Sequence, residues 1–344
     1  MTRQATSTDR WFSSNRYHLA VAVSLMIAAP VSGHHSEAGF DKTTIAAFEG
    51  VVTELDWRNP HVYVLVETTG ADSQPVQWRV ETSSTPILSR RGWTPDSLQP
   101  GDSVLVRGHP ERGTDRNYAL LLALQKEDGT ILTAAPLSSE SNARASGLSG
   151  IWKPDSATVA EFHRRVSSLP LTEKGAAARD SFDYYSESPV AQCIAHPAPW
   201  VFNSELYVNE VDVGEDVVIL HSEYFGVRRT VYMDGRGHPN DAERTLQGHS
   251  IGSWEDDTLV VDTRLFADHR IGNGPGIPSG AQRHVIERLT LSEDGTRIIY
   301  DMFVEDPEYL IEPLSARVEW LYVPELQRYG YDCDPEVSSM FRLD

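Results

Sequence analysis

Short apolar runs separated by tight turns recur through the second half of the chain, and they constrain its fold more than any other feature. Each run is rich in β-branched residues and is bounded by turn residues, which is typical of strands. The runs lie at residues 206–213, 216–225, 228–234, 249–254, 258–266, 283–292, 297–306 and 315–324. Because tight turns link successive strands antiparallel, the pattern predicts a lipocalin-like antiparallel β-barrel over residues 151–344.

A second group of strand-like runs precedes these. They lie at residues 48–57, 61–68, 75–82, 102–109 and 118–125, and a short helical piece at 85–93 lies among them. Such strands predict a small, partly closed OB-like barrel over residues 34–135. The Ser/Gly/Ala-rich segment 136–150 is typical of a linker. A short helix is expected at 173–182 with Thr172 as its N-cap, so the fold class is all-β with little helix.

The first 33 residues have the composition of a secretory signal peptide. Three arginines form a positive segment, an apolar run of 11 residues follows at 19–29, and the small residues Val31 and Gly33 stand before the expected cleavage point. This run is too short to span a bilayer, which takes roughly 20 apolar residues. We therefore expect a periplasmic or secreted protein that starts at His34 and has no stable membrane insertion.

The charge of the chain bears on its partners. It carries 50 Asp and Glu against 30 Lys and Arg, which gives a formal net charge of −20. Such a balance repels polyanions, so no nucleic-acid partner is expected.

The chain has only two cysteines, Cys193 and Cys333, and they lack a C-x-x-C spacing. In an oxidising compartment such a pair most simply forms one structural disulfide. The bridge would tie the start of the second barrel to the end of the chain.

Residues 248–252 read GHSIG, the G-x-S-x-G pattern that holds the nucleophilic serine of many lipases and esterases. That role needs a strand before the serine and a helix after it. Here a polar, loop-like segment precedes Ser250 and a strand-like run follows. Although Ser250, Asp262 and His284 stand in the chain order of such a triad, the pattern favours a β-hairpin. A serine hydrolase is only the third hypothesis.

Three motifs in the second half, and two in the first, resemble those of an exported bacterial family of largely uncharacterised function. The motifs are YMDGRGHP (232–239), GHSIGSWEDDTLVVDTRLF (248–266), HVIERL (284–289), HHSEAGFD (34–41) and GVVTELDWRNPHVYV (50–64). Asp256 and Ala267 depart from the glycine and asparagine that this family carries. The resemblance implies an exported two-domain β protein and no particular activity.

Polar residues on or beside the predicted strands are the candidates for chemistry. Catalytic roles are predicted for His249, His284, Glu287 and Arg288, and ligand-binding roles for Glu223, Arg229, Tyr232 and Glu255. A histidine oriented by a carboxylate is a suitable general acid or base. His284 and Arg288 are four residues apart on one face of a strand, whereas Glu287 faces the other side. The whole set therefore cannot line the lumen.

These candidates predict a small-molecule site in the second barrel. We expect His249, His284 and Arg288 to share one pocket, oriented by Glu223, Arg229 or Glu255. An apolar lumen with a few polar groups suits a small, largely apolar ligand. The leading hypothesis is therefore plain binding or cofactor-free acid/base chemistry of the isomerase, dehydratase, cyclase or lyase type.

The alternative hypothesis is a copper-binding exported protein. If cleavage follows Gly33, the chain starts with His34 and His35, and a terminal amine with an imidazole chelates Cu(II). A third nitrogen from His35 or His61 would complete a planar set. The two histidines could instead be only the processed end of the chain, and no other cofactor is expected.

Overall fold

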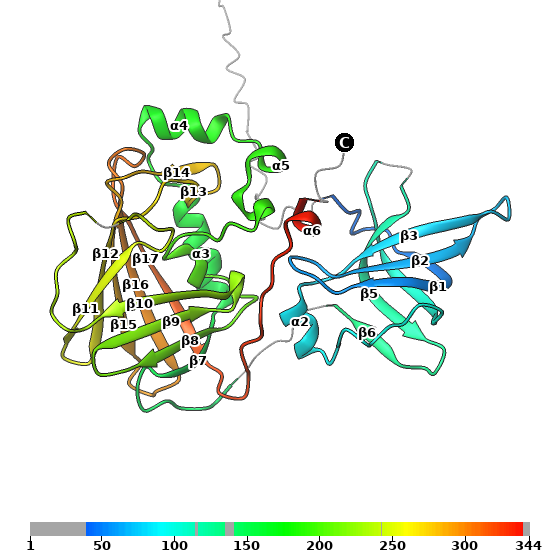
Figure 1. The fold of residues 1–344 in the computed structure, drawn as a ribbon, viewed down its shortest axis with the longest axis horizontal. Coiled ribbons are helices and arrows are strands. Elements are labelled where there is room, and N and C mark those ends of the chain that lie inside the picture. The colour runs from blue at the N-terminus through cyan, green and yellow to red at the C-terminus, as the bar shows by residue number, and fades with distance from the viewer. Residues whose placement is uncertain (1–38, 114–115, 135–140, 242, 340–344) are drawn as a thin grey trace, which may run out of the picture. The chain divides into compact units, whose positions relative to one another are not determined.

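The computed structural model describes residues 39–113, 116–134, 141–241 and 243–339, within one compact unit that spans Ser36–Asp344. The chain is mostly β, with a closed five-stranded barrel in its N-terminal part and a nine-stranded barrel in its C-terminal part (Figure 1). The predicted all-β class, an OB-like barrel followed by a lipocalin-like one, is confirmed. The predicted signal peptide and His34 and His35 lie outside the described residues, and the predicted domain boundaries stay a prediction.

The first barrel follows from five alternating strands and the connection that closes them. Its strands are β1 (Ala46–Asp56), β2 (Tyr63–Thr69), β3 (Pro75–Glu81), β4 (Ser103–Pro110) and β5 (Tyr118–Lys126), with β6 (Ile131–Thr133) added beside β5. Parallel pairing of β3 with β5 closes the barrel, and α2 (Thr85–Arg90) connects β3 to β4. Buried Val64, Val66, Val80 and Val106 fill its core. This arrangement matches the OB-like prediction.

The second barrel holds the candidate residues. Its strands are β7 (Gly150–Pro154), β8 (Asn209–Val213), β9 (Val217–Ser222), β10 (Val227–Tyr232), β11 (His249–Glu255), β12 (Thr258–Arg264), β15 (His284–Leu291), β16 (Arg297–Glu305) and β17 (Leu314–Tyr322). Strand β7 was not predicted because it is short and follows the linker-like segment. It pairs with β17 and β8 and so closes the circle.

One pairing departs from the expected up-and-down order. Strands β10 and β11 are parallel, with Val231 opposite Ser250 and Tyr232 opposite Ile251. Parallel neighbours need a connection that runs back along the barrel, and the described residues 233–241 and 243–248 belong to it. The other neighbouring strand pairs of this barrel are antiparallel. GHSIG begins the β11–β12 hairpin, so its predicted role as part of a hairpin is confirmed.

Besides the strands of the second barrel, the C-terminal part of the chain contains several short helices and a small β-hairpin (Figure 1). They are α3 (Ser156–Ser167), α4 (Glu173–Asp180), α5 (Tyr184–Glu187), η1 (Pro189–Gln192), η2 (Trp200–Phe202), η3 (Tyr224–Gly226), β13 (His269–Gly274), β14 (Ile277–Ser279) and α6 (Pro335–Ser339). Helix α3 was not predicted. It begins after the N-cap Asp155 and buries Val159, Phe162 and Val166 in the barrel core. Thr172 caps α4 as predicted, through the backbone N–H of Gly175. None of the helices among the described residues has both the length and the apolar character that crossing a membrane requires.

The two cysteines form the predicted disulfide. The sulfur atoms of Cys193 and Cys333 are 2.01 Å apart and their Cα atoms 5.7 Å apart. Cys193 follows η1, and Cys333 precedes α6. The bridge therefore joins the segment in front of β8 to the C-terminal end of the described chain.

Candidate functional site

Four polar residues gather on the outer face of strands β11, β12, β15 and β16. Buried side chains alternate with part-exposed ones along these strands, so His249, Asp262, His284 and Glu305 project away from the core. His284 Nε2 lies 3.0 Å from Asp262 Oδ1, and His284 Nδ1 lies 3.4 Å from Glu305 Oε2. The pairing of β12 with β15 and of β15 with β16 brings these side chains together.

A fifth residue, His238, connects this group to His249. It lies in the segment that joins β10 to β11, and its side chain is 16% exposed. His238 Nδ1 is 3.0 Å from His249 Nδ1, and His238 Nε2 is 3.0 Å from Asp262 Oδ1. A continuous hydrogen-bonded chain therefore runs from His249 through His238 and Asp262 to His284, and Glu305 lies beside the Nδ1 of His284. We call these five residues the outer-face chain.

The partners of the ring nitrogens fix the direction of these hydrogen bonds. A carboxylate only accepts, so His238 and His284 both donate from Nε2 to Asp262. A neutral His238 then accepts at Nδ1 from the Nδ1–H of His249. In that tautomer the Nε2 of His249 carries the lone pair, which is the arrangement of a general base.

The surroundings of His249 favour its neutral form. Burial lowers the pKa of His249, and its electrostatic interactions with His238 and Arg236 lower it further. The ring of Tyr232 stacks on His249 with 5.2 Å between the centroids, and the guanidinium carbon of Arg236 lies 4.1 Å from the centroid of the Tyr232 ring. His249 is thus held as a neutral base at neutral pH.

An apolar row lies beside the outer-face chain. The strand registers place Ile251 opposite Asp262, Asp262 opposite Ile286, and Ile286 opposite Phe303. These three apolar side chains are half-buried on the same outer face. An apolar group resting on this row would contact the neighbouring acid–base residues.

The inner face of the same strands carries a second polar group. Arg229 donates from Nε to Ser250 Oγ at 2.9 Å, from Nη1 to Glu287 Oε1 at 2.9 Å and from Nη2 to Thr263 Oγ1 at 2.5 Å. Tyr300 also donates its hydroxyl to Glu287. All five side chains are at most 2% exposed. Ser250 is therefore a buried partner of Arg229, in a strand rather than at a strand-to-helix turn.

The structure corrects the expected pocket of His249, His284 and Arg288. His249 and His284 lie on the outer face of the barrel, whereas Glu287 faces its core, because successive strand residues point to opposite sides. Arg288 lies on the outer face too, in an exposed ion pair with Glu255 at 2.5 Å. Buried Glu287 instead contacts Arg229 and Tyr300 in the barrel core.

Glu223 also has a different role from the expected one. It is fully buried and accepts from the guanidinium of Arg90, the last residue of α2 in the first barrel. It accepts from the backbone N–H of Tyr329 at 2.7 Å as well. These partners occupy its carboxylate, so Glu223 holds chain segments together and does not orient His249 or His284.

Sequence reasoning missed His238 as a site residue. It stands in YMDGRGHP, one of the motifs that carry the family resemblance. His249, Asp262 and His284 also stand in motifs that carry the resemblance. The presence of a histidine in such a motif could have indicated His238. Its position could not be predicted, because a loop has no regular alternation that shows which strand its side chains contact.

In the first barrel, His61 is oriented by its neighbours. Its Nδ1 lies 3.0 Å from the carbonyl oxygen of Thr82 and 2.8 Å from Glu81 Oε1. Because a carbonyl oxygen only accepts, Nδ1 carries the proton and Nε2 is the nitrogen suited to a metal. Within the described ranges, no three His, Cys, Asp or Glu side chains are placed to hold a metal ion together.

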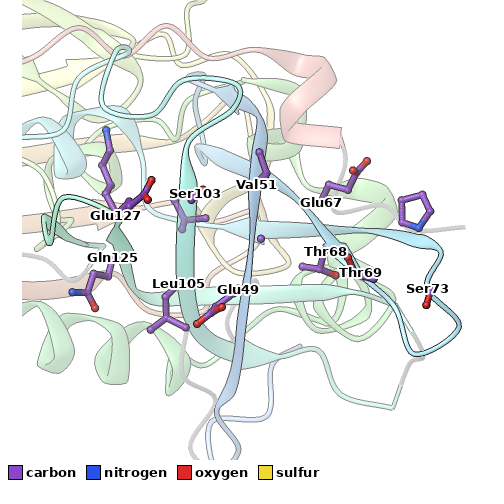
Figure 2. Close-up of a pocket in the computed structure, with 14 residues that line it drawn as sticks. Glu49, Val51, Glu67, Thr68, Thr69, Ser73, Ser103, Leu105, Gln125 and Glu127 are labelled. Carbon is purple, nitrogen blue, oxygen red and sulfur yellow. The ribbon is translucent and has the colours of Figure 1, made fainter.

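A hollow on the first barrel lies apart from these groups (Figure 2). It is open and is lined by β1, β2, β4 and β5, with Glu49, Glu67 and Glu127 among its residues. None of the residues predicted for catalysis or ligand binding lines it. The hollow therefore has no part in the acid–base arrangement described above.

Comparison with known proteins finds a family match for the N-terminal part of the chain. Residues 22–119 match a family of unknown function (DUF6152). None of the curated proteins matches the chain. The match fits the predicted resemblance of the N-terminal part to a largely uncharacterised family, and it brings no activity with it.

Proposed function

We propose that this chain is an exported enzyme that moves a proton on a small, largely apolar molecule without a cofactor, at the outer-face chain of its second barrel. The observation that carries the proposal is the unbroken series of hydrogen bonds from His249 through His238 and Asp262 to His284. Export is supported by the signal-like start of the chain and by the disulfide, since such bridges persist in oxidising compartments.

The tautomers described above give each residue a part in the reaction. His249 takes a proton from the substrate at Nε2. The resulting positive charge is shared with His238, because the Nδ1–H of His249 points at the Nδ1 of His238. Asp262 faces His238 and stabilises the charge there. Return of the proton to another atom of the substrate gives isomerisation, and its delivery to a leaving hydroxyl gives dehydration.

The substrate class follows from the apolar row. Ile251, Ile286 and Phe303 offer hydrocarbon surface next to Asp262, while Arg264 Nη2 lies 3.3 Å from His284 Nδ1 at the edge of the chain. A proton on carbon is acidic enough for a histidine base only beside an activating group. Small apolar ketones, hydroxyketones and unsaturated ketones meet both requirements.

Deuterium incorporation tests the proposal. The purified chain is incubated in D₂O with a panel of such ketones, and carbon-bound deuterium is followed by mass spectrometry. We expect labelling by the wild type and a loss of roughly 10²–10⁴-fold in Asp262→Asn, the usual contribution of a positioned acid–base group. Arg317→Gln, which removes only an exposed partner of Asp301, is the matched control and keeps full activity. The proposal fails if no ketone is labelled or if Asp262→Asn labels at the wild-type rate.

Copper binding is the second candidate, and the orientation of His61 favours it. The proton on Nδ1 leaves Nε2 as the ligating atom, which complements an amine and imidazole at His34. The test titrates Cu(II) into a protein that starts at His34 and into one that starts at Gly33. We expect the extension and His61→Ala each to weaken binding, and the wild-type affinity to fall with pH because the nitrogens must lose protons to ligate. Equal affinities for the two termini would rule this candidate out.

A further inference from the structure

The motifs of the second barrel contribute residues to both faces of its wall. In each of three strands, one motif residue belongs to the outer-face chain and another, on the inner side, contacts Arg229. The pairs are His249 with Ser250, Asp262 with Thr263, and His284 with Glu287. Residues one or three apart on a strand point to opposite faces, so this division follows from the spacing within each motif.

Arg229 is the common partner of the inner residues. Its guanidinium projects from β10 and reaches side chains of β11, β12 and β15. The donors of a guanidinium are held in one rigid plane, so each partner's position is fixed relative to the others. Ser250 Oγ and Thr263 Oγ1 are also within 3.0 Å of each other. A slip of one residue in any of these strands would break the group and turn its outer residue inward.

We propose that Arg229 is a positioning residue for the outer-face chain. By fixing β11, β12 and β15 from inside, it sets the spacing at which His249, Asp262 and His284 meet on the outside. The effect of Arg229 on catalysis rests on the proposed function, whereas its effect on the spacing of His249, Asp262 and His284 does not. The buried hydroxyl of Ser250 is then a partner of the positioning residue and not a nucleophile.

The test removes single partners of Arg229 and observes His249. Arg229 variants risk unfolding, so Ser250→Ala and Thr263→Val are used, each of which deletes one acceptor. Ser222→Ala is the matched control, because Ser222 is equally buried and loses one hydrogen bond, to the carbonyl oxygen of Val201 at 2.9 Å. Far-UV circular dichroism verifies that all variants are folded. The readout is the ¹⁵N resonances of the His249 ring and their titration with pH.

We expect Ser250→Ala and Thr263→Val to shift the His249 ring resonances and its titration midpoint, and Ser222→Ala to leave both unchanged. Ser250→Thr, which keeps a hydroxyl, should restore the wild-type signal. Turnover of any labelled ketone should fall roughly 10–100-fold in the two variants, as for lost supporting hydrogen bonds. The proposal is overturned if His249 is unaffected in both variants, or if Ser222→Ala shifts it equally. The ring resonances need no substrate, so their response separates failure of this proposal from failure of the proposed chemistry.

Discussion

His249 illustrates how local electrostatics set up an acid–base residue on an exposed β-sheet. Burial is the largest cause of its lowered pKa, followed by its electrostatic interactions with His238 and Arg236. A base of this kind is active only when neutral. We therefore expect the proposed activity to be fully present at neutral pH and to be lost as the pH falls through a midpoint below the ordinary His pKa of 6.5.

Arg236→Gln tests that electrostatic account. Removing a positive charge makes protonation of His249 easier, so the pKa of His249 rises and the acid limb of activity moves to higher pH. The titration of the His249 ring by NMR measures the shift directly. Arg317→Gln removes an equal charge elsewhere on the barrel and should leave the midpoint in place. An unchanged midpoint in Arg236→Gln would show that Arg236 does not act on His249.

The β11–β12 hairpin shows how the backbone places the histidine that precedes Ser250. Gly248 has a φ of +67°, and a Cβ there would lie 2.6 Å from the carbonyl oxygen of Arg264. The chain enters β11 through this close approach to β12. In the GHS sequence, Gly248 therefore allows the close approach to β12, His249 points outward and Ser250 points inward.

Gly248→Ala should cost roughly 1–3 kcal/mol, since it adds a steric clash to an unfavourable φ. The control is Gly129→Ala, at a φ of +86° with open space around the added Cβ, where only the φ penalty of about 1 kcal/mol applies. Urea unfolding of both variants measures the two costs. A loss in Gly248→Ala no larger than that in Gly129→Ala would mean that the close approach is relieved elsewhere.

Alternation along strands could be predicted from the sequence, and it correctly placed Glu287 on the opposite side from His284. The faces themselves could not be predicted, because the outer face of this barrel carries Ile251 and Ile286 while its core accepts Arg229 and Glu287. Apolar residues thus do not mark the inside uniquely. The parallel pairing of β10 with β11 also escaped prediction, since it depends on a connection with no regular pattern, and His238 lies in that connection.

At the scale of the whole molecule, the disulfide closes a long covalent loop. Cys193 and Cys333 are 140 residues apart in sequence. Next to Cys333, Asp334 donates its backbone N–H to the carbonyl oxygen of Asn59 and accepts from Arg58 at 2.7 Å. The bridge therefore anchors a C-terminal segment that also contacts the first barrel.

The double variant Cys193→Ser, Cys333→Ser should lose about 2–5 kcal/mol of unfolding free energy, the range expected for a long closed loop. Urea unfolding with and without reductant measures this loss. Reductant should bring the wild type to the midpoint of the double variant and leave the variant itself unchanged. Identical midpoints for oxidised wild type and the double variant would refute a stabilising bridge.

The central claim is that neutral His249 is the base that takes the proton of the substrate. The most direct test is the pH dependence of kcat/KM for the first ketone that is labelled, because this quantity reports the essential groups of the free enzyme. We predict one acid limb whose midpoint equals the NMR titration midpoint of His249, lies below 6.5 and disappears in His249→Gln. An acid limb that persists unchanged in His249→Gln would contradict the claim.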